Sequence, residues 1–305
     1  MILFEYFLCY HIIIYNNLKL RDLIILNTTN YVGGNTYTLK FPSATNFKDA
    51  KLSLYSFSMY NSTFNISQHL NNNKLYFKWF DQTEYTFTIP DGYYSVNDLN
   101  TFLHYQFIVN NLYAVNSSGS SYIYFVQFQT NSVQYKCEID TFYVPSATNA
   151  QTLGYKPPNG ATWSFPESNS LVQLTICPGL KSYFGMTNQT QFPSSMSDTI
   201  KNYQFLSTST PIVSPIFSYI LTTNLVVSNF NQSANVFAQF PINVKFGDLI
   251  NITSVQDSRI DIKDGIYSEI NVRLWTQDFE PLPFQDSELT LFLIVEHLLI
   301  RRHFH

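Results

Sequence analysis

Charge is scarce in this chain of 305 residues, because Asp, Glu, Lys and Arg together make up only 12% of it. An average soluble domain carries about 25% charged residues. The net charge is −4 and the one basic cluster is Arg301-Arg302 beside the end, which argues against nucleic acid as a main partner. So little charge on a chain rich in Phe, Tyr and Asn indicates surfaces that are occupied by other protein. A coding bias towards Asn, Ile, Phe, Tyr and Lys is the alternative explanation.

Cysteine is also rare. Cys9, Cys137 and Cys177 are widely spaced and form no C-x-x-C pair. An odd and scattered set predicts neither a disulfide framework nor a zinc site, so we interpret these residues as small buried hydrophobic side chains in a reducing compartment. Seven Asn-x-Ser/Thr triplets would suit a glycosylated secreted protein, but chance explains them in a chain so rich in Asn, Ser and Thr.

Catalytic signatures are missing as well. The sequence has no Gly-rich phosphate loop, no H-E-x-x-H and no G-x-S-x-G. His303 and His305 favour a solvated tail over a metal site, and Asp257, Asp261 and Asp264 lack the ligand spacing of a calcium loop. We therefore predict no enzyme, no catalytic residue, no metal ligand and no cofactor. A glycosidase stays open, because its paired carboxylates need to be close only in space.

The first thirty residues are apolar and resemble a targeting sequence only at first sight. A signal peptide needs a basic leader and a small-residue cleavage site, and residues 1–15 offer neither, with Glu5 interrupting the run. The run is also too short and too polar in its middle to span a bilayer. We interpret residues 1–30 as an apolar N-terminal arm or first strand. A cryptic signal or a membrane anchor is the alternative.

Strand signals fill most of the chain. Two alternating segments within residues 75–89 flank Asp81-Gln82-Thr83, which predicts a hairpin that Pro90 ends. Residues 52–59 alternate with a phase slip at Tyr55-Ser56, which is typical of a β-bulge. Further strands are predicted at 37–41, 122–128, 133–139, 172–176, 221–228, 236–240, 270–275 and 289–295.

One helix stands out among these strands. Ser95 is a good N-cap, and Asp98 three residues later completes a capping box. The apolar residues that follow recur at helical spacing, which predicts an amphipathic helix over about 95–108 with Phe102 and Leu103 buried. Because spacing for parallel βαβ units is absent, we predict an all-β fold, a single jelly-roll antiparallel β-sandwich with this one inserted helix at an edge or end.

The domain organisation follows from the strand pattern. We expect one jelly-roll domain over residues 31–296, with long loops in 140–220, and a basic, His-containing C-terminal tail over 297–305. The middle region contains Leu153-Gly154 and Phe184-Gly185, and each pair predicts a short helix or turn that Gly ends. We expect both to lie in the long loops of the sandwich.

Three features follow one another within residues 30–296. They are the stretch Ile89-Pro90-Asp91-Gly92-Tyr93-Tyr94, the Ser-capped helix with Leu99-Asn100, and a closing pair with Ile270-x-Val272-x-Leu274, Pro281-Leu282-Pro283-Phe284 and Leu289-x-Leu291-x-Leu293. In this order they resemble the penton, or minor capsid, proteins of virophages and polinton-like viruses, the mavirus type above all in length. The resemblance implies a jelly roll that forms homopentamers at the fivefold vertices of an icosahedral virion, among trimers of a double-jelly-roll major capsid protein.

A second class of function stays open. A carbohydrate-binding or receptor-binding jelly roll would use Trp79, Trp163 or Trp275 as a platform on which a sugar stacks, although a Trp in an alternating strand is more often a core residue. The two ideas are compatible, because a vertex protein can also bind a host-cell receptor or glycan through its outer loops. Assembly inside the host cell and location in the virion follow from the resemblance to penton proteins.

Overall fold

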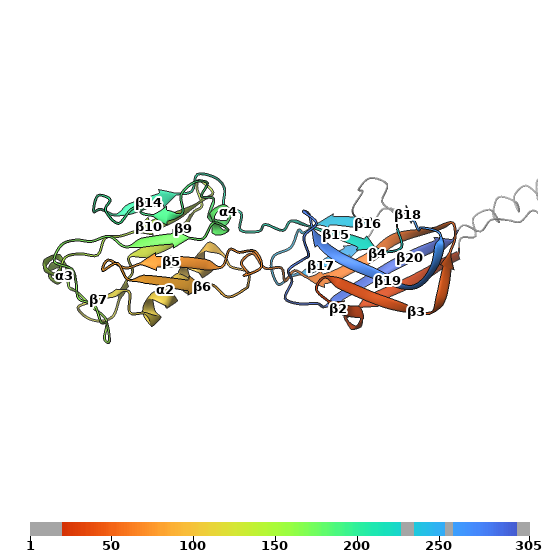
Figure 1. Ribbon diagram of the computed structural model, residues 1–305, viewed down its shortest axis with the longest axis horizontal. Helices are drawn as coiled ribbons and strands as arrows, with labels where there is room; N and C mark the ends of the chain where they lie inside the picture. Colours follow the sequence, from red (N-terminus) through yellow and green to blue (C-terminus); the bar gives the residue numbers. More distant parts are fainter. Residues whose placement is uncertain (1–19, 227–234, 254–258, 298–305) are drawn as a thin grey trace, which may run out of the picture. The chain divides into compact units, whose positions relative to one another are not determined.

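The computed structural model describes residues 20–226, 235–253 and 259–297. These residues form two compact units, each with its own hydrophobic core. The jelly-roll unit contains the described residues up to Thr63 and from Ile216 onwards, and the inserted unit runs from Phe64 to Pro215 (Figure 1). Each unit is a folded body in its own right.

The jelly-roll unit is an antiparallel sandwich of two sheets. Its strands are β1 (Leu20–Asn27), β2 (Tyr31–Gly33), β3 (Thr36–Phe47), β4 (Ala50–Tyr60), β15 (Ser218–Thr223), β16 (Val236–Pro241), β17 (Leu249–Thr253), β18 (Ile260–Asp261), β19 (Gly265–Thr276) and β20 (Leu289–His297), with a 3-10 turn at Thr28–Asn30. One sheet, the β20 sheet, has the order β1-β20-β4-β17, with β18 also paired to β4. The other, the β19 sheet, has the order β16-β15-β19-β3-β2.

The strand order defines the fold. Without the short β2 and β18, the β20 sheet joins the first, eighth, third and sixth strands of this unit, and the β19 sheet joins the fifth, fourth, seventh and second. This is the order of a jelly roll, so the predicted all-β, antiparallel jelly-roll class is confirmed. The inserted unit occupies the connection between β4 and β15, the third and fourth strands of that order.

The predicted β-bulge is confirmed. The pairing of β4 with β20 places Phe292 opposite Ser56 and Leu293 opposite Leu54, which leaves Tyr55 as the extra residue. Because the bulge absorbs the phase slip, the apolar residues on both sides of it reach the same core between the sheets: Leu52, Leu54, Phe57 and Met59.

The inserted unit is also rich in antiparallel strands. Its elements are β5 (Lys74–Lys78), β6 (Glu84–Thr88), α2 (Val96–Val109), β7 (Ala114–Asn116), β8 (Tyr122–Ile123), β9 (Val126–Asn131), β10 (Lys136–Thr141), α3 (Ala147–Leu153), β11 (Tyr155–Lys156), β12 (Gln173–Ile176), α4 (Leu180–Phe184), β13 (Gln191–Phe192) and β14 (Tyr203–Leu206). Its three sheets have the orders β13-β12-β5-β6, β14-β10-β9 and β11-β7-β8. The predicted hairpins at β5–β6 and β9–β10 are present.

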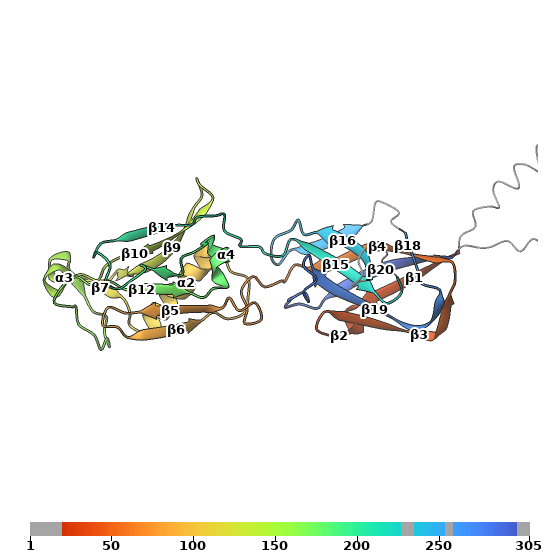
Figure 2. The ribbon, with the colours of Figure 1, turned by 45° about the horizontal axis from the view of Figure 1, so that its top comes forward.

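Helix α2 begins as predicted. The Ser95 hydroxyl accepts a hydrogen bond from the Asp98 backbone at 3.2 Å, and the Asp98 carboxylate accepts one from the Ser95 backbone at 2.8 Å. The helix lies close to β5, β6 and β9 (Figure 2). Its Phe107 side chain packs on Phe77 of β5, with 4.7 Å between ring centroids. Leu103 is buried, whereas Phe102 is only half-buried, so the prediction is right for the first and wrong for the second.

The expectation of one domain over residues 31–296 needs correction. The helix and the segment 140–220 belong mostly to the inserted unit with its own core, not to loops of a single sandwich. Alternation has the same period in both units, so it cannot indicate which core a strand joins. The boundary at residue 30 also moves, because β1 already pairs with β20 from Leu20. Residues 1–19, the proposed arm, and residues 298–305 lie outside the described part of the chain.

Two helices besides α2 occur in the inserted unit. α3 and α4 each end at a glycine with positive φ, Gly154 at 69° and Gly185 at 71°. The prediction of a short helix or turn that Gly ends is therefore confirmed at both places, as a short helix. A β-carbon on Gly185 would also collide with the carbonyl oxygen of Ser209, so this position requires glycine for space as well as for backbone conformation.

Candidate functional site

Side chains that could support chemistry are dispersed. Among the described residues, no group of three or more His, Cys, Asp and Glu could hold a metal ion. Asp261 forms an ion pair with Lys51 at 3.3 Å, and Asp264 accepts a hydrogen bond from the Asp49 backbone at 3.0 Å. These two acids therefore have structural partners, while Asp257 and the terminal His303 and His305 lie outside the described residues. In the same residues, no helix is long and apolar enough to cross a membrane.

The three tryptophans occupy different environments. Trp79 is buried in the core of the inserted unit, and the half-buried Trp163 packs against it with 5.3 Å between ring centroids. Burial makes Trp79 unsuitable as a sugar platform. Trp275 lies half-buried on the outer face of β19 and borders a hollow of the jelly-roll unit.

The outer face of the β20 sheet carries the first candidate surface. In β1, Ile24 and Leu26 enter the core, so the alternation of the strand directs Leu23 and Ile25 outwards. Leu23 is 56% exposed and Ile25 is 43% exposed. A sheet face that meets water normally carries polar side chains at such positions, so apolar ones indicate another occupant.

These side chains form a continuous set across strands. Leu23 lies opposite Ile294, and Ile25 lies opposite Phe292. Tyr55, the bulged residue of β4, is 51% exposed beside Phe292. We call these five residues the apolar band.

Polar rows border the apolar band on both sides. One row contains the ion pair of Arg21 and Glu296, with an N–O distance of 2.9 Å, and the other contains the pair Asn27 and Thr290. An apolar centre with a polar border is the usual composition of a protein interface. Among the described strands, β1 is also the edge of its sheet, so none of them pairs with its outer side.

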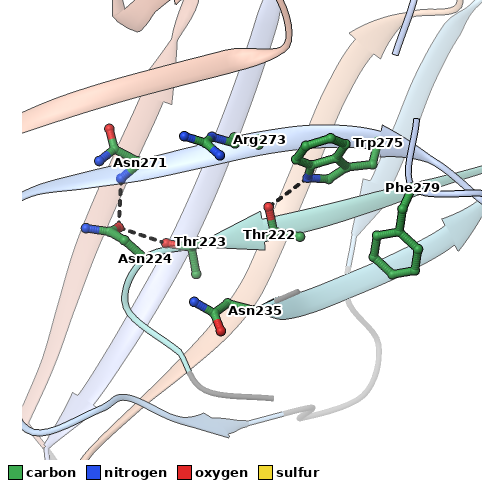
Figure 3. A pocket seen from close by; sticks show the side chains of 8 residues that line it. All are labelled: Thr222, Thr223, Asn224, Asn235, Asn271, Arg273, Trp275 and Phe279. Atoms are coloured by element: carbon green, nitrogen blue, oxygen red, sulfur yellow. Dashed lines mark hydrogen bonds between the residues drawn. The ribbon is translucent and has the colours of Figure 1, made fainter. Parts of the chain in front are cut away.

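The outer face of the β19 sheet carries the second candidate surface, a hollow of about 480 Å³. Asn271, Arg273 and Trp275 alternate along β19 on this face (Figure 3). The remaining lining comes from the ends of β15 and β16 and from the turn after β19: Thr222, Thr223, Asn224, Asn235 and Phe279. Two aromatic rings, three amides and one guanidinium therefore meet in one hollow.

Hydrogen bonds fix part of this lining. Trp275 donates its indole N–H to the Thr222 hydroxyl at 2.8 Å. The Asn224 side-chain oxygen accepts the Asn271 backbone N–H at 2.8 Å (Figure 3). The Asn271 side-chain oxygen accepts the Thr38 hydroxyl at 2.6 Å. Because Trp275, Asn224 and Asn271 are held by neighbouring strands, this part of the wall is ordered before any ligand arrives.

Two acids are buried on the outer face of β10 without a cation. Glu138 accepts from Asn131 at 2.7 Å and Gln204 at 2.8 Å. Asp140 accepts from Gln127 at 3.1 Å and Gln129 at 3.0 Å through one oxygen, while its other oxygen is buried without a partner. Burial raises the pKa of Asp140, and the Gln127 hydrogen bond opposes this while the Glu138 charge adds to it.

Asp140→Asn should therefore increase stability at neutral pH. The pKa of this carboxyl group is raised on folding, so the free energy of unfolding falls as pH rises from the ordinary pKa of 3.8 through the raised value. The amide cannot ionise, so the difference between variant and wild type should shrink as pH falls towards 3.8. Urea unfolding from pH 3 to 8 measures this, with Asp81→Asn as a control for the loss of an exposed charge. An Asp140→Asn variant that is no more stable than wild type at pH 7 would contradict the prediction.

Comparisons with known proteins show a distant likeness in structure and no match in sequence. No protein-family model matches the chain, and no curated protein matches it in sequence. Among solved structures, the chain is similar to the crystal structure of selenomethionine-labelled mavirus penton protein, with a TM-score of 0.42 and 11% identity over 92% of this chain and 98% of that one. The likeness is a distant one of fold.

Proposed function

We propose that this chain is a structural capsid subunit, the penton protein of a small icosahedral double-stranded DNA virus. In this role it forms homopentamers at the fivefold vertices and contacts the major capsid protein. The observation that carries the proposal is the apolar band on the outer face of the β20 sheet. A jelly roll that acted alone in water would gain nothing from exposing Leu23 and Ile25 there.

The arrangement suits a ring of identical subunits. In a closed ring each copy uses two different patches, one that contacts the previous copy and one that contacts the next. The apolar band supplies one patch of this kind. Its composition, apolar in the centre and polar at the border, supports burial against protein rather than lipid or nucleic acid.

Further exposed apolar side chains support more than one contact. In α2 the buried stripe faces the core, yet Tyr105, Ile108 and Val109 are exposed on the other side of the same helix. A shell subunit touches several neighbours, so it needs several such surfaces. The low total charge of 12% agrees with a surface that is largely covered after assembly.

The sequence pattern adds a separate line of support. The order of the 89–94 stretch, the Ser-capped helix and the closing strand pair resembles that of virophage penton proteins. Location in the virion and assembly inside the host cell belong to the same proposal.

Particle composition tests the proposal directly. Purified virions should contain the chain, and electron cryomicroscopy should place it at the fivefold vertices as five copies in contact over well above ~1,000 Å². Native mass spectrometry of the purified chain with its major capsid partner should give pentamers or mixed complexes. Absence from virions, or a position away from the vertices, would end the proposal.

A further inference from the structure

We infer that the hollow on the β19 sheet binds a carboxylated sugar, a sialic or uronic acid residue of a glycan. Arg273 would hold the carboxylate, and Trp275 and Phe279 would contact the apolar face of the ring (Figure 3). The hollow lies on the β19 sheet and the apolar band lies on the β20 sheet, so binding at the hollow can be tested independently of capsid assembly.

The size of the hollow suits a small ligand. Its volume of about 480 Å³ falls in the range of roughly 300–1,000 Å³ that small-molecule sites occupy. Asn271 and Trp275 lie four residues apart on one strand, which is about 13 Å at ~3.3 Å per residue. Arg273 lies between them, so its guanidinium and the aromatic rings can contact one ligand together.

The charge of the hollow points to an anionic group. Within the described part of the chain, Arg273 has no ion pair and no hydrogen-bond partner, and its neighbours on the adjacent strands are Thr36 and Thr222. The nearest acid on β19, Glu269, already accepts the Asn271 amide at 3.1 Å, and Asp278 and Glu280 follow in the exposed turn. An unpaired guanidinium presents a planar fork of donors that fits a carboxylate with two parallel bonds.

The other polar groups favour a sugar over an acidic peptide. Amide and hydroxyl side chains both donate and accept, which matches the hydroxyl groups of a saccharide. Asn224 and Asn271 are held by backbone and side-chain bonds, while the Asn235 side chain has no partner among the described residues. A Trp and a Phe at the same place add the apolar surface on which a pyranose ring packs.

Phe279 supplies an independent indication. Its φ is 60°, in the left-handed region that disfavours bulky side chains, and its backbone N–H bonds the Thr276 carbonyl at 3.1 Å to close the turn. Glycine or asparagine would make this turn without strain. A strained aromatic residue at the border of a hollow indicates that the ring itself is used.

Ligand-observed NMR of the full chain tests the inference with five probes: N-acetylneuraminic acid, glucuronic acid, galactose, acetate and a glutamate-rich peptide. At least one of the two acidic sugars should bind, while galactose and acetate should bind at least about tenfold more weakly. Which acidic sugar binds better identifies the glycan class. Equal binding of acetate, binding only of a glutamate-rich peptide, or no binding of either acidic sugar would overturn the inference.

Variants distinguish binding at the hollow from a general effect of surface charge. Arg273→Gln should weaken acidic-sugar binding at least about tenfold, and Lys40→Gln, a loss of the same charge on the same face outside the hollow, should leave binding unchanged. Phe279→Gly should lose binding while its melting temperature stays equal or rises, because the strain is relieved. Arg273→Gln with wild-type affinity, or equal losses in both charge variants, would refute the assignment.

Discussion

Replacing Leu23 and Ile25 together by glutamate should abolish assembly, with association weakened at least about a hundredfold. Both side chains point outwards from β1 within the apolar band. A carboxylate that is buried in a contact without a partner costs several kcal/mol, and about 1.4 kcal/mol corresponds to each tenfold loss of affinity. Native mass spectrometry of the variant with the major capsid protein, and its copy number in particles, measure the effect.

Ile266→Glu is the matched control. Ile266 is 74% exposed on β19 and lies outside the apolar band. This variant should assemble like wild type, and the monomers of both variants should melt within a few degrees of the parent, because the substituted side chains are exposed. Normal assembly of the double variant would show that the apolar band faces solvent in the particle.

Phe107→Ala should lower the free energy of unfolding by about 3 to 5 kcal/mol. The side chain is fully buried and packs 4.7 Å from Phe77 and 6.1 Å from Phe87 between ring centroids. Truncation removes its contacts with the sheet and leaves a cavity that the surrounding strands cannot fill. Denaturant unfolding followed by tryptophan fluorescence measures the loss, because Trp79 lies in the same core.

Tyr105→Ala tests whether the exposed side of α2 contributes to stability. Tyr105 is 59% exposed on the other side of α2, so its loss should change stability by no more than about 0.5 kcal/mol. Leu103→Ala should lower the free energy of unfolding by about 2 to 5 kcal/mol. Phe102→Ala should lower it by less than the loss of a fully buried Phe would, because Phe102 is half-buried. Equal costs for Phe107→Ala and Tyr105→Ala would mean that the orientation of the helix is wrong.

Local signals in the sequence predicted local structure well. The Ser95 and Asp98 cap, the bulge at Tyr55 and the β5–β6 hairpin all depend on neighbours within a few residues, and all three are present. The jelly-roll class also followed from many antiparallel strands. The insertion between β4 and β15 did not, because alternation reports burial of one face and says nothing about which core buries it.

The two candidate surfaces had weak signals in the sequence. Residues 23–26 and 291–295 are continuous apolar runs, a pattern typical of a strand buried on both faces. In the structure Leu23 and Ile25 are exposed and Phe292 and Ile294 are half-buried, and that mismatch is what marks the apolar band. The hollow required pairing information, because Arg273 and Trp275 meet Asn224 and Phe279 only through strand register and the turn after β19.

The position of β20 has a consequence for the order of folding. This strand is the last of the described elements, yet it lies between β1 and β4, the first and third strands of the jelly roll (Figure 2). During synthesis the inserted unit is complete once Pro215 has emerged, while β1 and β4 still lack the strand that joins them. Contacts between such distant segments form slowly. The apolar band combines side chains of β1, β4 and β20, so it forms only when β20 pairs with β1 and β4, and a chain that is still being synthesised cannot present it.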